Sequence, residues 1–226
     1  MMEDINLFPL FLSVRVALTA TLFALVIGIP IAYYLNRSNG RLADLIDTLI
    51  TLPVVLPPTV LGYYLLVLFG RQSSIGTFLE DRFDITIVFT PAGAVMAALV
   101  VSIPFLIKSA RSAFAGIDPT LLQAARILGR TEWNIFVTIM IPLAWRGIAA
   151  GITLAFARAL GDFGATLMVA GSIPNETMTM PIAIYDALLA GNRELANVLV
   201  LIMTAVSLSM LYMINRLEKR VTKGKG

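Results

Sequence analysis

The side chains available for chemistry in this chain are carboxylates, amines, guanidinium groups and hydroxyls, because its 226 residues include no cysteine and no histidine. This composition excludes thiol nucleophiles, disulfides, imidazole bases and the usual zinc, haem and iron–sulfur ligands. The chain also lacks a G-x-x-x-x-G-K-[ST] pattern, so it has no phosphate cradle of its own for ATP hydrolysis. We therefore predict no catalytic residue, no bound cofactor and no metal, and expect a conduit rather than an enzyme.

One pair of charged residues stands inside an otherwise apolar stretch. Arg158 and Asp162 are four residues apart, which is the spacing of an ion pair on one face of a helix. Each charge at membrane depth costs at least about 2.5 to 3.5 kcal/mol and seldom faces lipid. Two interpretations stay open: a structural pair that fixes helix packing, which we favour, or a contact of Arg158 with a passing anion. Gly161 and Gly164 indicate a kink or a close helix approach beside the pair.

The elements that must position these residues are membrane helices. Of the residues, 58% are hydrophobic and only 14% are charged, and the mean hydropathy is +0.86. A helix needs about 20 apolar residues to cross about 30 Å of hydrocarbon. The chain is therefore expected to form one all-α transmembrane domain over residues 1–226, with about five transmembrane helices. The expected spans are approximately 12–36, 48–70, 85–107, 147–170 and 195–215.

The distribution of basic residues predicts the orientation. The segments 37–41, 108–146 and 216–225 hold 12 of the 17 lysine and arginine residues, and all three lie on one side of a five-span layout. Since cytoplasmic segments carry such an excess, we expect the N-terminus outside and the C-terminus in the cytoplasm. The basic residues are spread among several segments rather than pooled on one exposed domain, so no nucleic-acid partner is expected.

The cytoplasmic segment 108–146 is unusually long for a chain that otherwise crosses lipid, and loops of this size usually have a function. Asp118 and Pro119 form a typical helix start, and Gly129 is placed as its stop. On periodicity alone, the short helix between them is read as an interfacial helix tucked under its own bundle. Residues 133–145 are too short to span, and we expect them to approach the membrane along its surface.

The second span carries three prolines, Pro53, Pro57 and Pro58. A proline inside a helix removes an amide hydrogen and leaves carbonyls that lipid cannot satisfy. Irregular backbone of this kind is tolerated where it faces protein or water, so one hypothesis is that the segment lines a passage and forms part of its gate. The alternative is that prolines are simply commoner in membrane helices.

The long loop resembles the EAA loop of ABC importer permeases. That loop has the pattern E-A-A, three residues, G, nine residues and I-x-L-P, and the spacing here fits it throughout. There are two departures: Gln123 stands where glutamate is usual, and Ile141 stands where leucine is usual. In this family the loop helix docks on a cytoplasmic ATPase subunit. The resemblance assigns that coupling role to Gln123, Ala124, Ala125, Arg126, Gly129, Ile139 and Pro142.

The similarity extends over nearly the whole chain. The runs 52–58, 155–166 and 173–177 look like the permease subunit of molybdate ABC transporters, with the sulfate permeases as close relatives. The resemblance implies a homodimer with the passage on its two-fold axis, in a bacterial or archaeal cytoplasmic membrane. It also implies ATPase partners that carry ATP and magnesium, and an extracytoplasmic molybdate-binding protein. The expected pathway and gate residues are Pro53, Pro57, Pro58, Arg158, Gly161, Asp162 and Gly164.

Several alternatives remain at this point. Tungstate or sulfate could replace molybdate as the solute, because much of the selectivity of such systems resides in the binding protein. A secondary transporter would show paired repeats or its own coupling-ion site, and neither is visible. A membrane-embedded enzyme acting through carboxylates would need two acids at membrane depth, where only Asp162 is clearly available.

Overall fold

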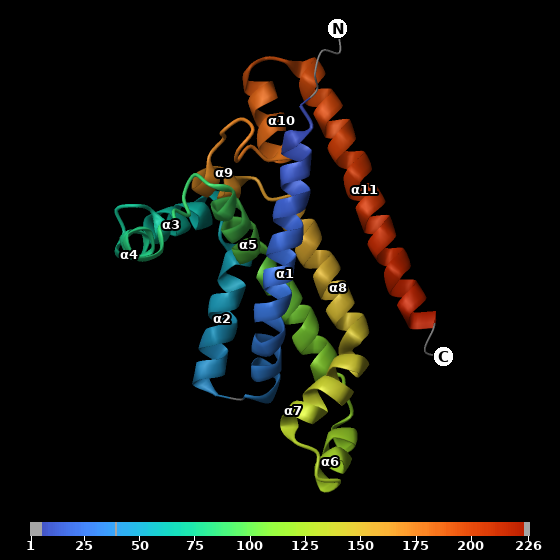
Figure 1. Cartoon of the computed structure of the whole chain (residues 1–226). Coiled ribbons are helices and arrows are strands. Elements are labelled where there is room, and N and C mark those ends of the chain that lie inside the picture. Colours follow the sequence, from blue (N-terminus) through green and yellow to red (C-terminus); the bar gives the residue numbers. More distant parts are fainter. Residues whose placement is uncertain (1–5, 39, 224–226) are drawn as a thin grey trace.

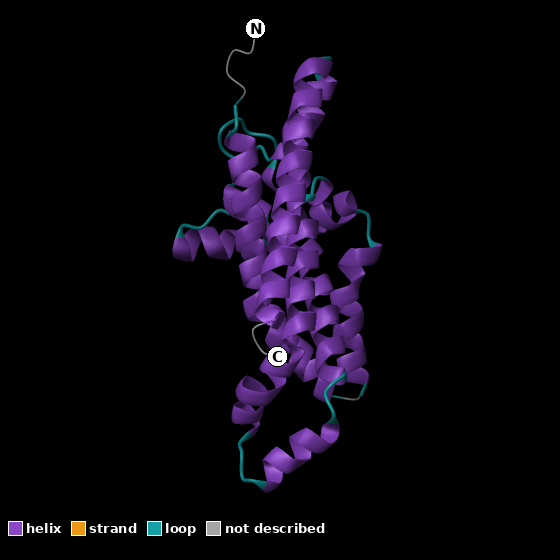
Figure 2. Cartoon of the chain, turned by 90° about the vertical axis from the view of Figure 1, so that its right-hand side faces the viewer, coloured by secondary structure: helices purple, strands orange, loops and turns teal. Residues whose placement is uncertain are grey.

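The computed structural model describes residues 6–38 and 40–223, with side chains described up to residue 214 and at 216, and within this part it contains helices and no strand (Figure 2). Residues 1–5, 39 and 224–226, which include part of the charge pattern used for orientation, lie outside it. The helices are α1 (Phe8–Arg37), α2 (Arg41–Val55), α3 (Pro58–Phe69), α4 (Ser74–Phe83), α5 (Pro91–Ala115), α6 (Pro119–Ile127), α7 (Glu132–Ile135), the π-helical segment η1 (Phe136–Met140), α8 (Ile141–Leu160), α9 (Gly164–Ala170), α10 (Met180–Leu189) and α11 (Arg193–Lys223).

Helices α1, α5 and α8 pack against one another and form the centre of the molecule (Figure 1). Their contact faces carry many alanines, among them Ala20, Ala98 and Ala159, which lets the backbones approach closely. At Gly28 the approach is close, since an added Cβ would lie 2.7 Å from a methyl group of Leu106. Without water to drive apolar helices together, this close packing is what holds the centre.

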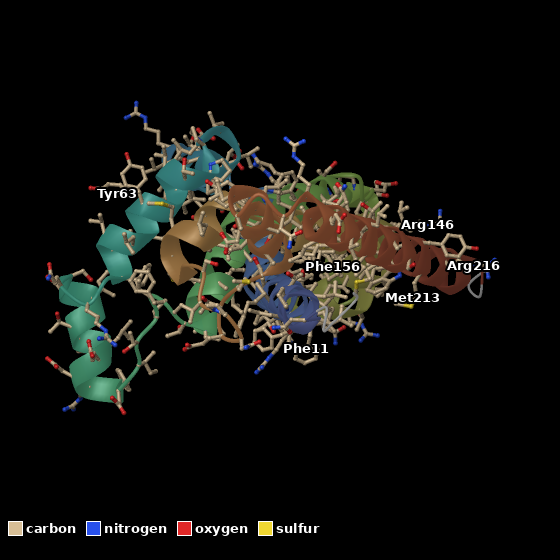
Figure 3. The ribbon with its side chains drawn as sticks, turned by 90° about the horizontal axis from the view of Figure 1, so that it is seen from above. Phe11, Tyr63, Arg146, Phe156, Met213 and Arg216 are labelled. Carbon is tan, nitrogen blue, oxygen red and sulfur yellow. The ribbon has the colours of Figure 1, made fainter. Side chains whose placement is uncertain are left out.

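Helix α11 leans away from the centre, and only 6% of its most apolar window is buried. Seen from above, Met213 and Arg216 of α11 lie at one end of the molecule, and Tyr63 of α3 lies toward the other (Figure 3). Two opposite flanks of the chain are thus left with large apolar side chains exposed, as expected where lipid or another subunit covers them.

In the described part of the chain, four helices are long and apolar enough to cross a membrane, and the bent pair α2 and α3 makes a fifth if it is counted as one span. The prediction of an all-helical chain with about five membrane helices is confirmed to this extent. The pair is bent by 118° at Leu56 and Pro57. Pro58 disfavours a helical backbone in the residue before it and has no amide hydrogen to donate, so the break follows from the sequence.

The residues of the expected fourth span, 147–170, do not form one continuous helix. A continuous helical stretch of 29 residues runs from Glu132 through η1 to Leu160, and α9 is a separate short helix. Residues 133–145 are therefore continuous with this helix and do not form a separate element. The reason is the π turn, in which the N–H of Ile141 donates to the carbonyl of Phe136, five residues back. This wider turn absorbs Pro142, which would otherwise clash with the preceding turn.

Candidate functional site

The short loop helix forms where its start and stop signals predict it. Asp118 caps α6, with its Oδ1 accepting the N–H of Thr120 at 2.9 Å. This backbone hydrogen bond is the main reason why the pKa of Asp118 is lowered from its ordinary value. Gly129 ends the turn with φ +77°, a left-handed conformation that favours glycine. Helix α6 and the start of α7 project beyond the ends of α1 and α2 at one end of the molecule (Figure 1).

Most of α6 is exposed, so the interpretation of a helix tucked under its own bundle holds for one side only. Ile127 and Leu128 are 85% and 81% exposed, and Ala124 is exposed beside them. Ala125, by contrast, is buried in a cluster with Ile135. Adjacent residues of the Gln-Ala-Ala run therefore point in different directions. The outer surface of α6 is an apolar patch of the kind that marks a protein interaction site.

Arg126 turns back toward its own chain. Its Nε lies 2.7 Å from Oε1 of Glu132, and the same carboxylate pairs with Arg37 at the end of α1. The hydrogen bond from Arg126 to Glu132 raises the pKa of the arginine above its ordinary value. Two of the other predicted coupling residues are also separate from the outer surface of α6: Ile139 lies in η1 and Pro142 in the first turn of α8.

The structure brings the two predicted groups of pathway residues together. Gly164, at the start of α9, lies against the start of α3, where an added Cβ would be 3.1 Å from Cβ of Pro58. One turn further along α3, a Cβ on Gly62 would be 2.6 Å from Cβ of Met168. The break between α2 and α3 and the break between α8 and α9 therefore meet. Pro53 precedes this meeting point in the chain. It lies inside α2 and does not break the helix.

The predicted ion pair is present, with Nη1 of Arg158 3.1 Å from Oδ1 of Asp162. Asp162 is buried and lies beyond the end of α8, in the break itself. Its other carboxylate oxygen accepts two hydrogen bonds from Thr166, at 3.0 Å from the backbone N–H and at 2.7 Å from the hydroxyl. Asp162 therefore joins the end of α8 to α9. Thr166 was missed in the sequence, although its spacing of four residues from an aspartate at a helix start was visible.

A cavity of about 650 Å³ lies between α2, α5 and α8. Lys108 is on its wall, and its Nζ lies 2.7 Å from Oδ1 of Asp47 on α2. Arg111 pairs with the other oxygen of the same carboxylate at 3.2 Å. Two cations share one anion, which leaves a net positive charge beside the cavity. Among the side chains that the structure describes, no three acidic groups come together in a way that could hold a metal ion.

Comparisons with known proteins agree with this geometry. Residues 24–223 match the family model described as binding-protein-dependent transport system inner membrane component. The molybdenum transport system permease protein ModB of Escherichia coli K12 is 48% identical over 174 residues, which is 77% of this chain and 76% of that protein. The protein of the same name from Haemophilus influenzae is 40% identical over 216 residues, 95% of this chain and 94% of its own.

Solved structures show the same fold at lower identity. A chain of the MetNI methionine ABC transporter, in an inward-facing conformation, has a TM-score of 0.74 and 17% sequence identity. The match covers 99% of this chain and 99% of that chain. The bacterial alginate ABC transporter, in complex with its pentasaccharide-bound periplasmic protein, also reaches 0.74 over 95% of this chain.

Proposed function

The chain belongs to the family of binding-protein-dependent transport system inner membrane components, and from this we propose that it is the permease subunit of an ATP-driven molybdate importer. The observation that carries the coupling part of the proposal is α6, a capped helix whose outer surface is apolar and exposed. An exposed patch of this kind indicates a docking partner. The solute follows from two relatives, each at least 40% identical, whose names specify molybdenum transport.

The proposed partner at α6 is a cytoplasmic ATPase subunit that carries ATP and magnesium. Ala124 and the large side chains of Leu121 and Leu128 would enter its groove, since all three are exposed. Gln123 would offer an amide oxygen as acceptor without the negative charge of the usual glutamate. With α6 in the cytoplasm, a chain of five spans would have its N-terminus outside. An external binding protein would deliver the solute at the opposite face.

The passage is proposed to lie between two copies of the chain, on the axis of a homodimer. A single set of five spans is too small to enclose a polar pathway, and symmetric pairs are the commonest oligomer. One face of α2 carries the exposed side chains of Leu45, Leu49 and Leu52, and this face would line the dimer centre. The gate would be the meeting point of the two helix breaks, where Pro58 touches Gly164. Broken helices at membrane depth are typical of transport pathways.

An oxyanion that passed this gate would enter the cavity beside Lys108. The positive charge shared by Lys108 and Arg111 would attract the anion, while the opening of the cavity would keep its binding weak enough for release. Arg158 would not need to contact the anion, because its guanidinium is held by Asp162. The gate and the cavity beside Lys108 then have separate roles, the first in closure and the second in electrostatic guidance.

The test is purification of the tagged chain in mild detergent together with its ATPase, followed by reconstitution in vesicles with molybdate-loaded binding protein. We expect stoichiometric co-purification, two copies of the chain per complex, and ATP-dependent molybdate uptake. Stimulation by tungstate-loaded or sulfate-loaded protein alone would reassign the solute. Failure of any ATPase to co-purify would overturn the proposal.

A matched pair of variants tests the docking surface. Ala124→Trp places a bulky side chain on the exposed face of α6, and it should abolish ATPase binding while the chain stays folded. Ala205→Trp adds the same side chain on an exposed position of α11 and should leave ATPase binding intact. Ala125→Trp is unsuitable, because Ala125 is buried against the chain's own core. Unchanged ATPase binding in Ala124→Trp would refute docking through α6.

A further inference from the structure

Three charged side chains from separate parts of the chain meet at the cytoplasmic end of the molecule as proposed above. Arg126 lies in the last turn of α6, and its Nε is 2.7 Å from Oε1 of Glu132. Glu132 is the first residue of the long helical stretch that leads into α8. Its Oε2 contacts Nη1 of Arg37, the last residue of α1, which is 95 residues away in the chain. One carboxylate therefore connects the loop helix, α1 and α8.

Arg37 is held in place from its other side. Its guanidinium donates to the hydroxyl of Tyr33 and lies 5.4 Å from the centroid of the same ring. The ring of Tyr33 packs on Phe136 in η1, with centroids 4.5 Å apart, and on Phe114 in α5 at 6.4 Å. We call the ion pairs of Arg126, Glu132 and Arg37 the charged bridge. Its end on α1 is fixed because Tyr33 packs on aromatic rings from two other helical segments. The position of Arg37 is therefore set by its packing against several helices, and not by the arginine side chain alone.

The bridge has too little burial to be a stability element. The side chains of Arg37, Arg126 and Glu132 are 41%, 42% and 46% exposed, and ion pairs at such exposure add little to folding stability. The bridge matters more for how the helices are connected than for folding stability. The backbone connects α6 directly to α5 and to the helix that begins at Glu132, but it does not connect α6 to α1. The Glu132 carboxylate adds a polar connection from α6 to α1, beside the apolar cluster that holds Ala125.

We propose that Glu132 is a positioning residue for energy coupling: through Arg126 and Arg37 it passes movement of α6 to α1, so that α1 moves together with α5 and α8. The inference rests on the proposed function, because it takes α6 as the docking point of the ATPase. Since α1 already packs along both α5 and α8, the bridge adds a direct connection between its cytoplasmic end and the loop helix, so that the three helices follow α6 as one body. Without the bridge, the cytoplasmic end of α1 would follow ATP-driven closure only through its packing on α5 and α8.

The experiment compares Glu132→Gln with the unmodified chain in the complete complex, reconstituted in vesicles with molybdate-loaded binding protein. ATP hydrolysis and molybdate uptake are measured in the same vesicles. We expect hydrolysis to stay within about twofold and uptake per ATP to fall about fivefold or more, the lower end of typical coupling between sites. The midpoint of thermal unfolding should stay within about 2 °C, in keeping with a surface ion pair. Glu194→Gln, which alters an exposed carboxylate at the start of α11, is the control and should change neither ratio nor midpoint.

A double-mutant cycle tests whether Glu132 acts through Arg37. If it does, Arg37→Gln lowers the uptake ratio by itself, and the double variant Arg37→Gln/Glu132→Gln loses no more than the single ones. Additive losses, an unchanged ratio in Glu132→Gln, or a parallel fall of hydrolysis, uptake and unfolding midpoint would overturn the proposal. Absence of ATP-driven uptake by the unmodified complex would instead refute the proposed function itself.

Discussion

Asp162 offers the sharpest test of how the two helix breaks are held. Its carboxylate is buried and accepts three hydrogen bonds, one from Arg158 and two from Thr166. The change Asp162→Ala would leave the N–H and hydroxyl of Thr166 and the guanidinium of Arg158 without their acceptor. Helix α9 would lose its connection to the end of α8, and we expect the packing of α9 against α3 to loosen.

The magnitude follows from the geometry. Removal of one partner of a buried ion pair costs about 3 to 5 kcal/mol, and the low end applies because the side chain of Arg158 is 28% exposed and can reach water. We therefore expect about 3 kcal/mol for Asp162→Ala. Asp162→Asn keeps an acceptor oxygen for Thr166 and loses only the charge, so its expected cost is about 1 to 2 kcal/mol.

The assay is thermal unfolding of the purified chain in detergent, followed by its tryptophan fluorescence. For a chain of this length, 1 kcal/mol shifts the midpoint by about 2 to 4 °C, so Asp162→Ala should lower it by about 6 to 12 °C. Thr166→Val, which removes one hydroxyl donor at nearly constant volume, should cost about 1 kcal/mol. Exchange of Arg158 and Asp162 should not rescue stability, because an arginine at position 162 has no acceptor for Thr166.

Two results would refute this reasoning. An unfolding midpoint in Asp162→Ala within about 2 °C of the unmodified chain would show that the hydrogen bonds of Asp162 do not stabilise the fold, whatever their geometry. A loss in Asp162→Asn as large as that in Asp162→Ala would show that the charge, rather than the hydrogen bonds to Thr166, is what stabilises the break.

Three further predictions concern local geometry. Gly129→Ala should destabilise the end of α6 by about 1 to 2 kcal/mol because of its positive φ, with Gly129→Asn better tolerated, as measured by hydrogen exchange of the α6 amides. Gly62→Ala should cost about 1 to 3 kcal/mol by pushing α3 off Met168, again seen in the unfolding midpoint. The lowered pKa of Asp118 means that its cap is present above pH 4 or so and is lost as pH falls through the folded-state pKa. Asp118→Asn should remove this pH dependence from limited proteolysis of the loop.

Features that depend on neighbouring residues along the chain could be predicted from the sequence. The capping aspartate, the following proline and the later glycine define α6, because each acts within one helical turn. The charge-free stretches give the number of spans, because the thickness of the bilayer sets their length. The break at Leu56 and Pro57 follows from the restriction that a proline places on its own backbone and on the residue before it.

Features that depend on distant residues were decided only by the tertiary structure. The π turn that carries the helix through Pro142 was not visible in apolar run lengths, so the helical stretch from Glu132 to Leu160 was not expected as one element. Which side of α6 is buried depends on Phe136 and Ile135 packing against Ala125, since α6 by itself could turn either way. The meeting of Pro58 with Gly164 and of Arg37 with Glu132 joins residues about a hundred positions apart. Spacing along the chain sets where a helix begins and ends, whereas helix packing sets which side chains meet.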